Sequence, residues 1–304
     1  MKNLWNTEDA EKLGNDLLKL RVYSSRLLGQ EENLVLHGGG NTSVKTKEKN
    51  IFGEEEVIIY IKGSGWDLAT IKDAGFAPVK LQVLQKLAQL ETLSDVDMVK
   101  NQRTAMTDPS APNPSVEAIL HAIIPHKFVD HTHADAIVTI SNTPNGEEKI
   151  RDLFGDKVLV VPYVMPGFVL AKQIYQLTKD LDWNSIDGMI LLNHGVFTFD
   201  DNARSSYEKM ISIVTKAENH LSENTSNTIE NPVNGEIDSL KIAELRQAVS
   251  NVWEKPILAQ WDHSSFSRAF SNHPDIEKIA TSGPLTPDHI IRTKRTPVIL
   301  SDNP

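Results

Sequence analysis

The 304-residue sequence contains no cysteine. A chain without thiols forms neither disulfides nor thiolate metal sites, and it has no cysteine nucleophile. Any metal centre must therefore be built from its ten histidines and from carboxylates. Histidine and carboxylate ligands suit catalytic zinc, so the histidines are the residues through which a metal site is expected.

Long apolar runs are also missing. No stretch approaches the roughly 18 uninterrupted apolar residues of a membrane-spanning helix. The first 16 residues lack a basic region followed by an apolar one, which is the pattern of a secretory signal. Acidic residues outnumber basic ones, 41 to 31, for a net charge of −10. This balance argues against nucleic acid or an anionic membrane as a partner, while leaving room for a small basic pocket. We therefore expect a cytoplasmic protein.

The composition changes abruptly at one place in the chain. Hydrophobic residues make up 39% of the sequence, enough for a packed core. Residues 223–237 are rich in Asn, Ser, Thr, Glu, Pro and Gly, which predicts a linker. Residues 238–304 begin with an amphipathic helix but are few for an independent core. We predict a main domain at 1–222 and a helical extension at 238–304 that docks on it or on a neighbouring subunit.

Two histidines separated by one residue, His131 and His133, follow a short apolar run. On a strand, alternate side chains share a face, so the two imidazoles would lie side by side. Zinc in catalytic sites typically takes three protein ligands and keeps one position open. A packed or hydrogen-bonded pair explains the motif at least as well, so the metal interpretation requires a third ligand.

Residues 188–199 predict two apolar strands interrupted by Asn193-His194-Gly195. A histidine in the turn of an otherwise hydrophobic hairpin needs a polar partner, which makes His194 the natural third ligand. A lone buried histidine is more often only hydrogen-bonded. Ser115 predicts an N-cap, with Glu117 in the first helical turn, where the helix dipole alone explains a carboxylate. His121, one turn later, could share that face or be packed.

Two small-residue loops follow predicted strands. Three consecutive glycines precede Asn41, and Gly63-Ser64-Gly65 follows the predicted strand 57–62, with Lys62 beside it. Exposed backbone amides together with one cation suit a phosphate or carboxylate. A tight glycine turn without a ligand is the alternative. The first loop is not a dinucleotide-binding loop, because residues 45–50 are polar and turn-rich rather than helical.

These motifs, in this order, resemble the class II aldolase/adducin family over about Leu13–Leu221. The likeness is nearest to the aldolase portion of bifunctional rhamnulose-1-phosphate aldolase/alcohol dehydrogenase proteins, through residues 95–133 and 283–294. The expectation is that only this aldolase portion is present. The resemblance implies an α/β fold: a three-layer α/β/α arrangement with a mostly antiparallel central sheet, plus the C-terminal docking extension.

The resemblance also assigns roles to individual residues. It places the zinc ligands at His131, His133 and His194, with one Zn²⁺ per subunit, and the general base at Glu117. It places the substrate phosphate at Gly40, Asn41, Ser64, Gly65 and Ser115. Fuculose-phosphate members carry two serines before the glutamate, whereas the second position here is Val116. Family members form cyclic tetramers with active sites between subunits, so a homotetramer is expected.

The implied reaction is a retro-aldol cleavage of a ketose 1-phosphate, such as rhamnulose 1-phosphate, to dihydroxyacetone phosphate and lactaldehyde. Two alternatives stay open: a pentulose-5-phosphate 4-epimerase of the same family, and a non-catalytic adducin-like module without the metal. Three cationic residues in the extension could close over a phosphate from a neighbouring subunit, although a solvated basic turn is the plainer interpretation. They are His289, Arg292 and Lys294.

Overall fold

The computed structural model describes residues 1–225, 238–290 and 294–300. The chain divides into two compact units. Unit 1 combines Met1–Asn224 with Pro284–Arg295, and unit 2 comprises Thr225–Gly283 and Thr296–Pro304. Most of the predicted linker lies outside the described residues, and so does Arg292. A segment of the predicted extension thus packs within the same unit as the main domain.

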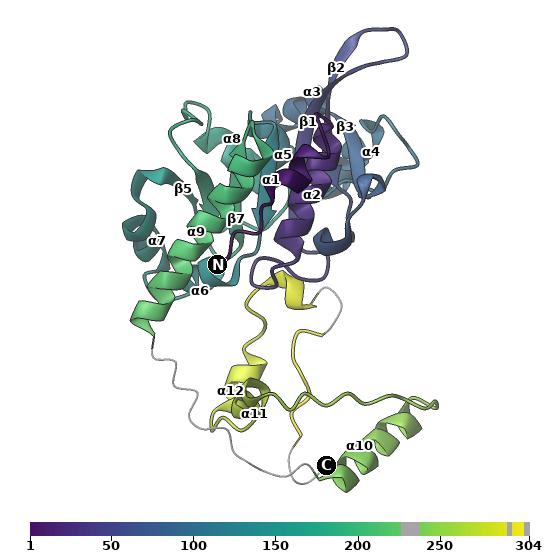
Figure 1. The fold of residues 1–304 in the computed structure, drawn as a ribbon, viewed down its shortest axis with the longest axis vertical. Coiled ribbons are helices and arrows are strands. Elements are labelled where there is room, and N and C mark those ends of the chain that lie inside the picture. Colours follow the sequence, from purple (N-terminus) through teal and green to yellow (C-terminus); the bar gives the residue numbers. More distant parts are fainter. Residues whose placement is uncertain (226–237, 291–293, 301–304) are drawn as a thin grey trace. The chain divides into compact units, whose positions relative to one another are not determined.

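The described part of unit 1 contains a seven-stranded sheet (Figure 1). The strands lie in the spatial order β3-β2-β1-β4-β7-β6-β5, and only β5 and β6 are parallel. The predicted strand at 57–62 and the predicted pair at 188–199 are both present. The strands are β1 (Asn41–Lys49), β2 (Glu55–Lys62), β3 (Phe76–Lys80), β4 (Phe128–Thr132), β5 (Val158–Val161), β6 (Gly188–Leu191) and β7 (Gly195–Asp200).

Helices cover both faces of this sheet. Figure 1 shows α2 and α9 on the face toward the viewer. The α-helices of unit 1 are α1 (Thr7–Glu11), α2 (Leu17–Gly29), α3 (Leu81–Gln89), α4 (Asp95–Thr104), α5 (Ala118–Ile123), α6 (Asp135–Ser141), α7 (Gly146–Phe154), α8 (Phe168–Leu177) and α9 (Ala203–Asn224). Short 3-10 helices are η1 (Leu68–Thr70), η2 (Asp73–Gly75), η3 (Gly155–Lys157) and η4 (Pro287–Ile290).

Side-chain alternation along the strands sends apolar residues to both faces. Phe197 of β7 packs with α3, α5 and α8, whereas the preceding Val196 packs with α2, α6, α7 and α9. In the same way, Met189 and Ile190 of β6 enter opposite cores. A sheet buried on both sides requires a helical layer on each. The predicted three-layer α/β fold with a mostly antiparallel sheet is confirmed.

One element contradicts the sequence interpretation. Residues 45–50 were expected to be turn-rich, but residues 41–49 form β1, which lies between β2 and β4. The polar sequence is accommodated because its long side chains find partners at the edges of the core. Lys45 is buried, and its Nζ donates a hydrogen bond of 2.7 Å to the His126 carbonyl. A central strand can therefore be polar where neighbouring backbone supplies acceptors.

A fully buried ion pair joins the helical layer to the sheet. Arg21 of α2 and Asp130 of β4 are both 0% exposed and hydrogen-bonded to each other. Arg21 also donates to the Val129 carbonyl at 3.4 Å, and Ser206 of α9 donates to the second oxygen of Asp130 at 2.5 Å. The pair therefore fixes α2 and α9 against the strand that leads to His131.

Replacing Asp130 with alanine is expected to lower the free energy of unfolding by about 3–5 kcal/mol, because it leaves the Arg21 guanidinium buried without a counter-charge. Urea unfolding followed by circular dichroism measures this loss. The double variant Arg21→Met/Asp130→Leu removes both charges and should recover most of the stability. A loss below about 1 kcal/mol, the scale of an exposed pair, would show that the pair is not structural.

Unit 2 contains three helices among its described residues: α10 (Ser239–Val252), α11 (Ser265–Ser271) and α12 (Ile276–Thr281). Asp238 caps α10 by accepting from the backbone amides of Leu240 and Lys241. None of these helices has a fully buried residue. Across the described ranges of both units, every helix is too short or too polar to cross a bilayer.

Candidate metal centre and active site

His131 lies on β4, opposite Phe197 of β7 in the antiparallel register. Its ring is fully buried and stacks on the Phe197 ring with centroids 4.0 Å apart. Its Nδ1 donates to the Val196 carbonyl at 3.1 Å, since a carbonyl can only accept. This bond fixes the tautomer, so the Nε2 of His131 carries a lone pair directed into the site.

His133 and His194 approach His131 from two different connections. His133 follows the end of β4, and His194 lies in the turn between β6 and β7. The turn is tight because Asn193 adopts a left-handed conformation with φ of 57°. Gly195 allows β7 to approach β4, since a Cβ there would lie 2.3 Å from the Thr132 carbonyl oxygen. The ligand atoms of the three histidines lie within 4.8 Å of one another.

Glu117 faces two of these histidines. It is the N-cap of α5 rather than a first-turn residue, and it is buried. Its Oε2 lies 3.5 Å from His131 Nε2, and its Oε1 lies 3.4 Å from His194 Nε2. The Nδ2 of Asn41 donates to Oε2 at 2.5 Å. Glu117 is therefore held beside the histidines by the first residue of β1.

His121 supports this arrangement from behind. Its Nε2 donates to the Oδ1 of Asn41, and its Nδ1 accepts from the Ser43 hydroxyl at 2.8 Å. Burial lowers the pKa of His121 well below its ordinary value, which keeps the ring neutral. His121, which the sequence left without a role, thus orients the Asn41 amide toward Glu117.

The electrostatics of the cluster fit a cation. Burial lowers the pKa of His131 well below its ordinary value, and His133 and His194 lower it further. Burial also lowers the pKa of His194, although Glu117 opposes this effect. The lone pair of His131 Nε2 therefore lies 3.5 Å from Glu117 Oε2, so that one acceptor faces another. A cation coordinated by the imidazoles would relieve this contact.

Unsatisfied polar atoms point to the same conclusion. Among the residues that the structure describes, His131 Nε2, Glu117 Oε1 and His194 Nδ1 are buried and make no hydrogen bond. Leaving a buried acceptor unpaired costs about 1–3 kcal/mol. Three imidazoles with an adjoining carboxylate form the donor set of a catalytic zinc site. The residues present therefore fit the expected metal.

The expected phosphate loops lie together beside this cluster. A Cβ on Gly38 would lie 3.4 Å from the carbonyl oxygens of Gly65 and Trp66. The Ser64 amide donates to the Asn113 carbonyl at 2.8 Å, and the Ser115 amide donates to the Lys62 carbonyl at 3.1 Å. The three segments around Gly40, Gly65 and Ser115 are thus neighbours, although they are far apart in sequence.

The Asn41 side chain is already fully engaged. Besides its bonds to Glu117 and His121, its Nδ2 donates to the Ser115 hydroxyl at 3.1 Å. Gly40, with φ of +56°, lies where a Cβ would be 2.7 Å from the His131 carbonyl oxygen. A phosphate contact by these two residues would come from backbone groups. Ser64 and Gly65 are exposed, so they are accessible to a ligand.

Lys62 is the cation nearest to these loops. It is buried, and its Nζ donates to the Gly38 carbonyl at 2.6 Å. Burial lowers the pKa of Lys62 to about 8, against the opposing attraction of Asp288, Asp67 and Glu117. Lys62 therefore remains charged at neutral pH and lies within electrostatic reach of Glu117.

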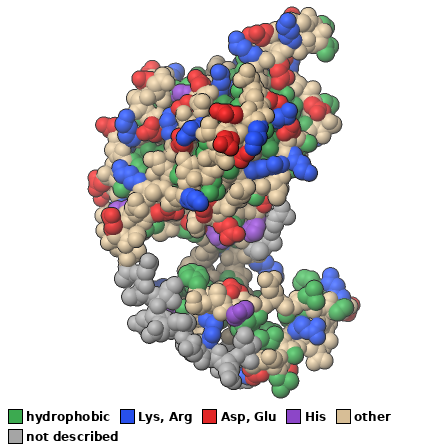
Figure 2. Space-filling model, viewed as in Figure 1, with side chains coloured by type: hydrophobic (Ala, Val, Ile, Leu, Met, Phe, Trp, Pro, Cys, Tyr) green, Lys and Arg blue, Asp and Glu red, His purple; other side chains and the backbone are tan. Residues whose placement is uncertain are grey.

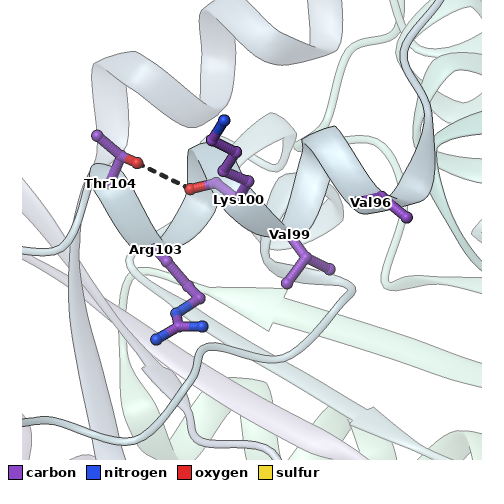
Figure 3. Close-up of a pocket in the computed structure, with 5 residues that line it drawn as sticks. All are labelled: Val96, Val99, Lys100, Arg103 and Thr104. Atoms are coloured by element: carbon purple, nitrogen blue, oxygen red, sulfur yellow. Dashed lines mark hydrogen bonds between the residues drawn. The ribbon is translucent and has the colours of Figure 1, made fainter.

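A separate hollow lies on the outer face of α4 (Figure 3). It has a volume of about 370 Å³, lined by Val96, Val99, Lys100, Arg103 and Thr104. It contains neither histidine nor carboxylate and shares no residue with the histidine cluster. On the face drawn in Figure 2, acidic and basic side chains are interspersed over unit 1. This hollow therefore adds no residue to the candidate metal centre.

Comparison with protein families identifies the family to which this fold belongs. The class II aldolase and adducin N-terminal domain matches residues 20–221. The second domain of class II aldolases matches residues 236–304. The chain belongs to the class II aldolase and adducin family. Its described helices and strands in unit 1 are those of an aldolase-type domain.

Individual relatives agree with this family assignment. An uncharacterized oxidoreductase of Bacillus subtilis, YuxG, is 33% identical over 315 residues. The match covers 100% of this chain but 45% of that protein, so the chain spans about half the length of its relative. The N-terminal class II aldolase domain of a conserved protein from Thermoplasma acidophilum is 40% identical, with a TM-score of 0.66. That match covers 73% of this chain and 99% of the domain. An aldolase II superfamily protein from Pseudomonas syringae shares the fold, at 15% identity and a TM-score of 0.50 over 81% of this chain and 94% of its own.

One residue beside the candidate metal centre was missed by the sequence interpretation. Asp288 accepts a hydrogen bond of 2.5 Å from His133 Nδ1 and is almost completely buried. The sequence interpretation named instead the cationic residues that follow it, His289, Arg292 and Lys294. His289 lies beside Thr286, whose hydroxyl is 2.9 Å from its Nδ1. No local signal marked Asp288, because the burial of a single aspartate cannot be read from a turn sequence.

Proposed function

We propose that this chain is a zinc-dependent aldolase that cleaves a ketose 1-phosphate resembling rhamnulose 1-phosphate. The products would be dihydroxyacetone phosphate and lactaldehyde. One observation carries the proposal: the ligand atoms of three buried histidines lie within 4.8 Å of one another, and the Glu117 carboxylate lies 3.4–3.5 Å from two of them. A site of this kind suits a reaction in which negative charge develops on oxygen beside a carbon that exchanges a proton.

The proposed mechanism assigns separate tasks to the residues of the site. His131, His133 and His194 would hold Zn²⁺. When bound, this ion would act as a Lewis acid on the substrate oxygens next to the bond that breaks. Glu117 would move the proton at the carbon that leaves as dihydroxyacetone phosphate. Its Oε2 accepts a hydrogen bond from Asn41, whereas its Oε1 makes no hydrogen bond within the described structure. Oε1 is therefore the atom available for this transfer.

The loops beside the cluster would bind the substrate phosphate. Backbone amides near Gly40, Asn41 and Gly65, with the hydroxyls of Ser64 and Ser115, would supply donors at the place where Lys62 supplies charge. Binding energy from a phosphate remote from the broken bond helps to orient the reacting carbon. Val116 stands in place of a second serine, so one hydrogen-bond donor is missing. Lys62 would therefore contribute a larger part of the phosphate-binding energy.

Lys62 makes the proposal sensitive to pH. Because its pKa is lowered to about 8 by burial, it loses its charge as the pH rises through that value. A sugar phosphate stays dianionic there, since its second pKa is about 6. We expect a KM that is constant below pH 8 and rises above it. Initial rates at pH 7 to 9.5 measure this.

Lys62→Met should raise the KM at pH 7 by about 10- to 100-fold, the value of a charge-assisted hydrogen bond, and abolish its pH dependence. Lys86→Met, which removes an exposed charge from α3, serves as the control. An unchanged KM in Lys62→Met would remove Lys62 from the substrate site.

A substrate panel tests the proposed activity against the alternatives. Rhamnulose 1-phosphate, fuculose 1-phosphate and ribulose 5-phosphate are supplied in turn to the zinc-loaded protein. Dihydroxyacetone phosphate released from either ketose 1-phosphate supports the aldolase. Epimerised pentulose phosphate without cleavage would support the epimerase. A protein that takes up no Zn²⁺ and is inactive on all three substrates would support the adducin-like module.

The proposal includes a homotetramer with active sites between subunits and a cytoplasmic location, both of which stay predictions. Exposed apolar side chains support association of subunits. Val96 and Val169 are 80% and 66% exposed, on either side of the hydrogen bond from the Phe168 amide to the Asp95 carboxylate. A contiguous exposed apolar patch at this place would be typical of an interface between subunits.

A further inference from the structure

Asp288 brings the C-terminal part of the chain to the histidine cluster. It lies in the 3-10 helix η4, 155 residues after His133 in sequence. Its Oδ1 accepts from His133 Nδ1 at 2.5 Å, and its Oδ2 accepts from the Leu36 amide at 2.9 Å. Only 1% of Asp288 is exposed. A carboxylate with both oxygens engaged in this way is fixed in position and orientation.

The hydrogen bond to Asp288 decides what His133 can do. A carboxylate accepts and does not donate, so His133 must carry its proton on Nδ1. Its Nε2 then has the free lone pair that a ligand atom needs. Among metal-binding histidines, a carboxylate on the second ring nitrogen orients the ring and raises its basicity. His131 achieves the same tautomer through the Val196 carbonyl, which carries no charge.

Gly39 provides independent support, because the space beside it is filled by Asp288. A Cβ on Gly39 would lie 1.9 Å from Asp288 Oδ1 and 2.1 Å from its carboxyl carbon. Gly39 is not among the residues of positive φ, so its backbone does not require glycine. What requires glycine is the approach of the Asp288 carboxylate. At least one glycine of the expected phosphate loop therefore serves the aspartate rather than a phosphate.

The surroundings of Asp288 are balanced in charge. Lys62, whose Nζ bonds to the Gly38 carbonyl, interacts favourably with the Asp288 carboxylate. Burial raises the pKa of Asp135, and the Asp288 charge raises it further. Burial lowers the pKa of His194, whereas the charges of Glu117 and Asp288 oppose that effect. Asp288 thus adds one negative charge next to, but outside, the set of candidate ligands. This charge strengthens the attraction of the cluster for a cation.

We propose that Asp288 is a positioning residue of the metal centre, through which the segment 284–290 becomes part of the site. The proposal rests on the metal site of the proposed function. Asp288 would hold His133 in the ligating tautomer and orientation, and Gly39 would leave room for it to do so. Because binding is reciprocal, a bound metal would in turn strengthen the docking of segment 284–290 on the Leu36–Gly40 loop.

The test measures metal affinity rather than turnover. Zn²⁺ is titrated into the metal-free full-length protein in competition with a chromophoric chelator. Asp288→Asn keeps an acceptor for His133 but loses the charge, and Asp288→Ala loses both. We expect affinities that fall in this order, by about 10- to 100-fold overall. The visible absorption of the Co²⁺-loaded protein should change in the same order, since it reports on ligand geometry.

Two further variants make the result specific. Gly39→Ala should displace the Asp288 carboxylate and weaken Zn²⁺ binding in the same way, although no ionisable group is changed. Asp275→Asn removes an exposed carboxylate of the same extension and should bind as the wild type does. Thermal unfolding of the metal-free proteins identifies any variant that fails to fold, in which case Asp288→Asn, the most conservative change, decides.

The outcomes separate this inference from the proposed function. A wild-type protein that binds no divalent ion would overturn the proposed function and this inference with it. A wild-type protein that binds one Zn²⁺ tightly, with equal affinity and an equal Co²⁺ spectrum in folded Asp288→Asn and Gly39→Ala, would overturn this inference alone. Lower stability without lower metal affinity would assign Asp288 a purely structural role, which also contradicts the proposal.

Discussion

Replacing His194 with alanine is expected to remove both the bound metal and the turnover. The three imidazoles each offer one ligand atom, and these atoms lie within 4.8 Å of one another. The two imidazoles that remain in the variant cannot complete the three-ligand set of a catalytic zinc site. The loss of affinity should exceed the roughly 10- to 100-fold typical of an outer partner. Metal content by mass spectrometry and initial rates on the same preparation measure the two effects. His131→Ala should behave in the same way.

A histidine outside the cluster provides the control. His263→Ala removes an exposed imidazole of unit 2 and should leave metal content and rate unchanged. The metal-free His194→Ala protein should unfold at a temperature near that of the metal-free wild type, because the effect acts through the ligand rather than through packing. Zinc retained at full stoichiometry in folded His194→Ala would contradict its assignment as a ligand.

The convergence of the three histidines was accessible from sequence for a geometric reason. Alternation along β4 and the tight turn before β7 are local properties, and a buried antiparallel pair brings the ends of its strands together. The observed register places His131 opposite Phe197, three residues after His194. The fold was accessible through the family resemblance, which implied a mostly antiparallel sheet between two helical layers.

Contacts over long sequence distances were not accessible. The polar sequence of β1 has no strand periodicity of its own. It forms a strand because it pairs with β2 and β4. Nothing near Asp288 announces that its partner is His133, 155 residues away. The link from His121 through Asn41 to Glu117 likewise joins residues about 80 positions apart. Such contacts depend on the tertiary packing rather than on any local pattern.

Replacing Glu117 with glutamine is expected to keep the metal and to slow proton exchange by about 10²- to 10⁴-fold, the usual contribution of a positioned acid–base group. Glutamine has the same size, and its Oε1 can still accept from Asn41, but an amide does not take up a proton near neutral pH. Deuterium incorporation from D₂O into dihydroxyacetone phosphate, followed by NMR, measures exchange without requiring the aldehyde. Zinc content is measured on the same sample.

Measuring proton exchange and zinc content together distinguishes loss of the general base from disturbance of the metal ligands. Glu117 lies against His131 and His194, so a variant that merely disturbed the ligands would lose zinc together with exchange. Glu91→Gln, an identical change at an exposed glutamate paired with Lys172, should alter neither. Exchange at the wild-type rate in zinc-loaded Glu117→Gln would exclude Glu117 as the base. Loss of exchange with one zinc retained would assign the proton transfer to the Glu117 carboxylate, acting as a base and not as a zinc ligand.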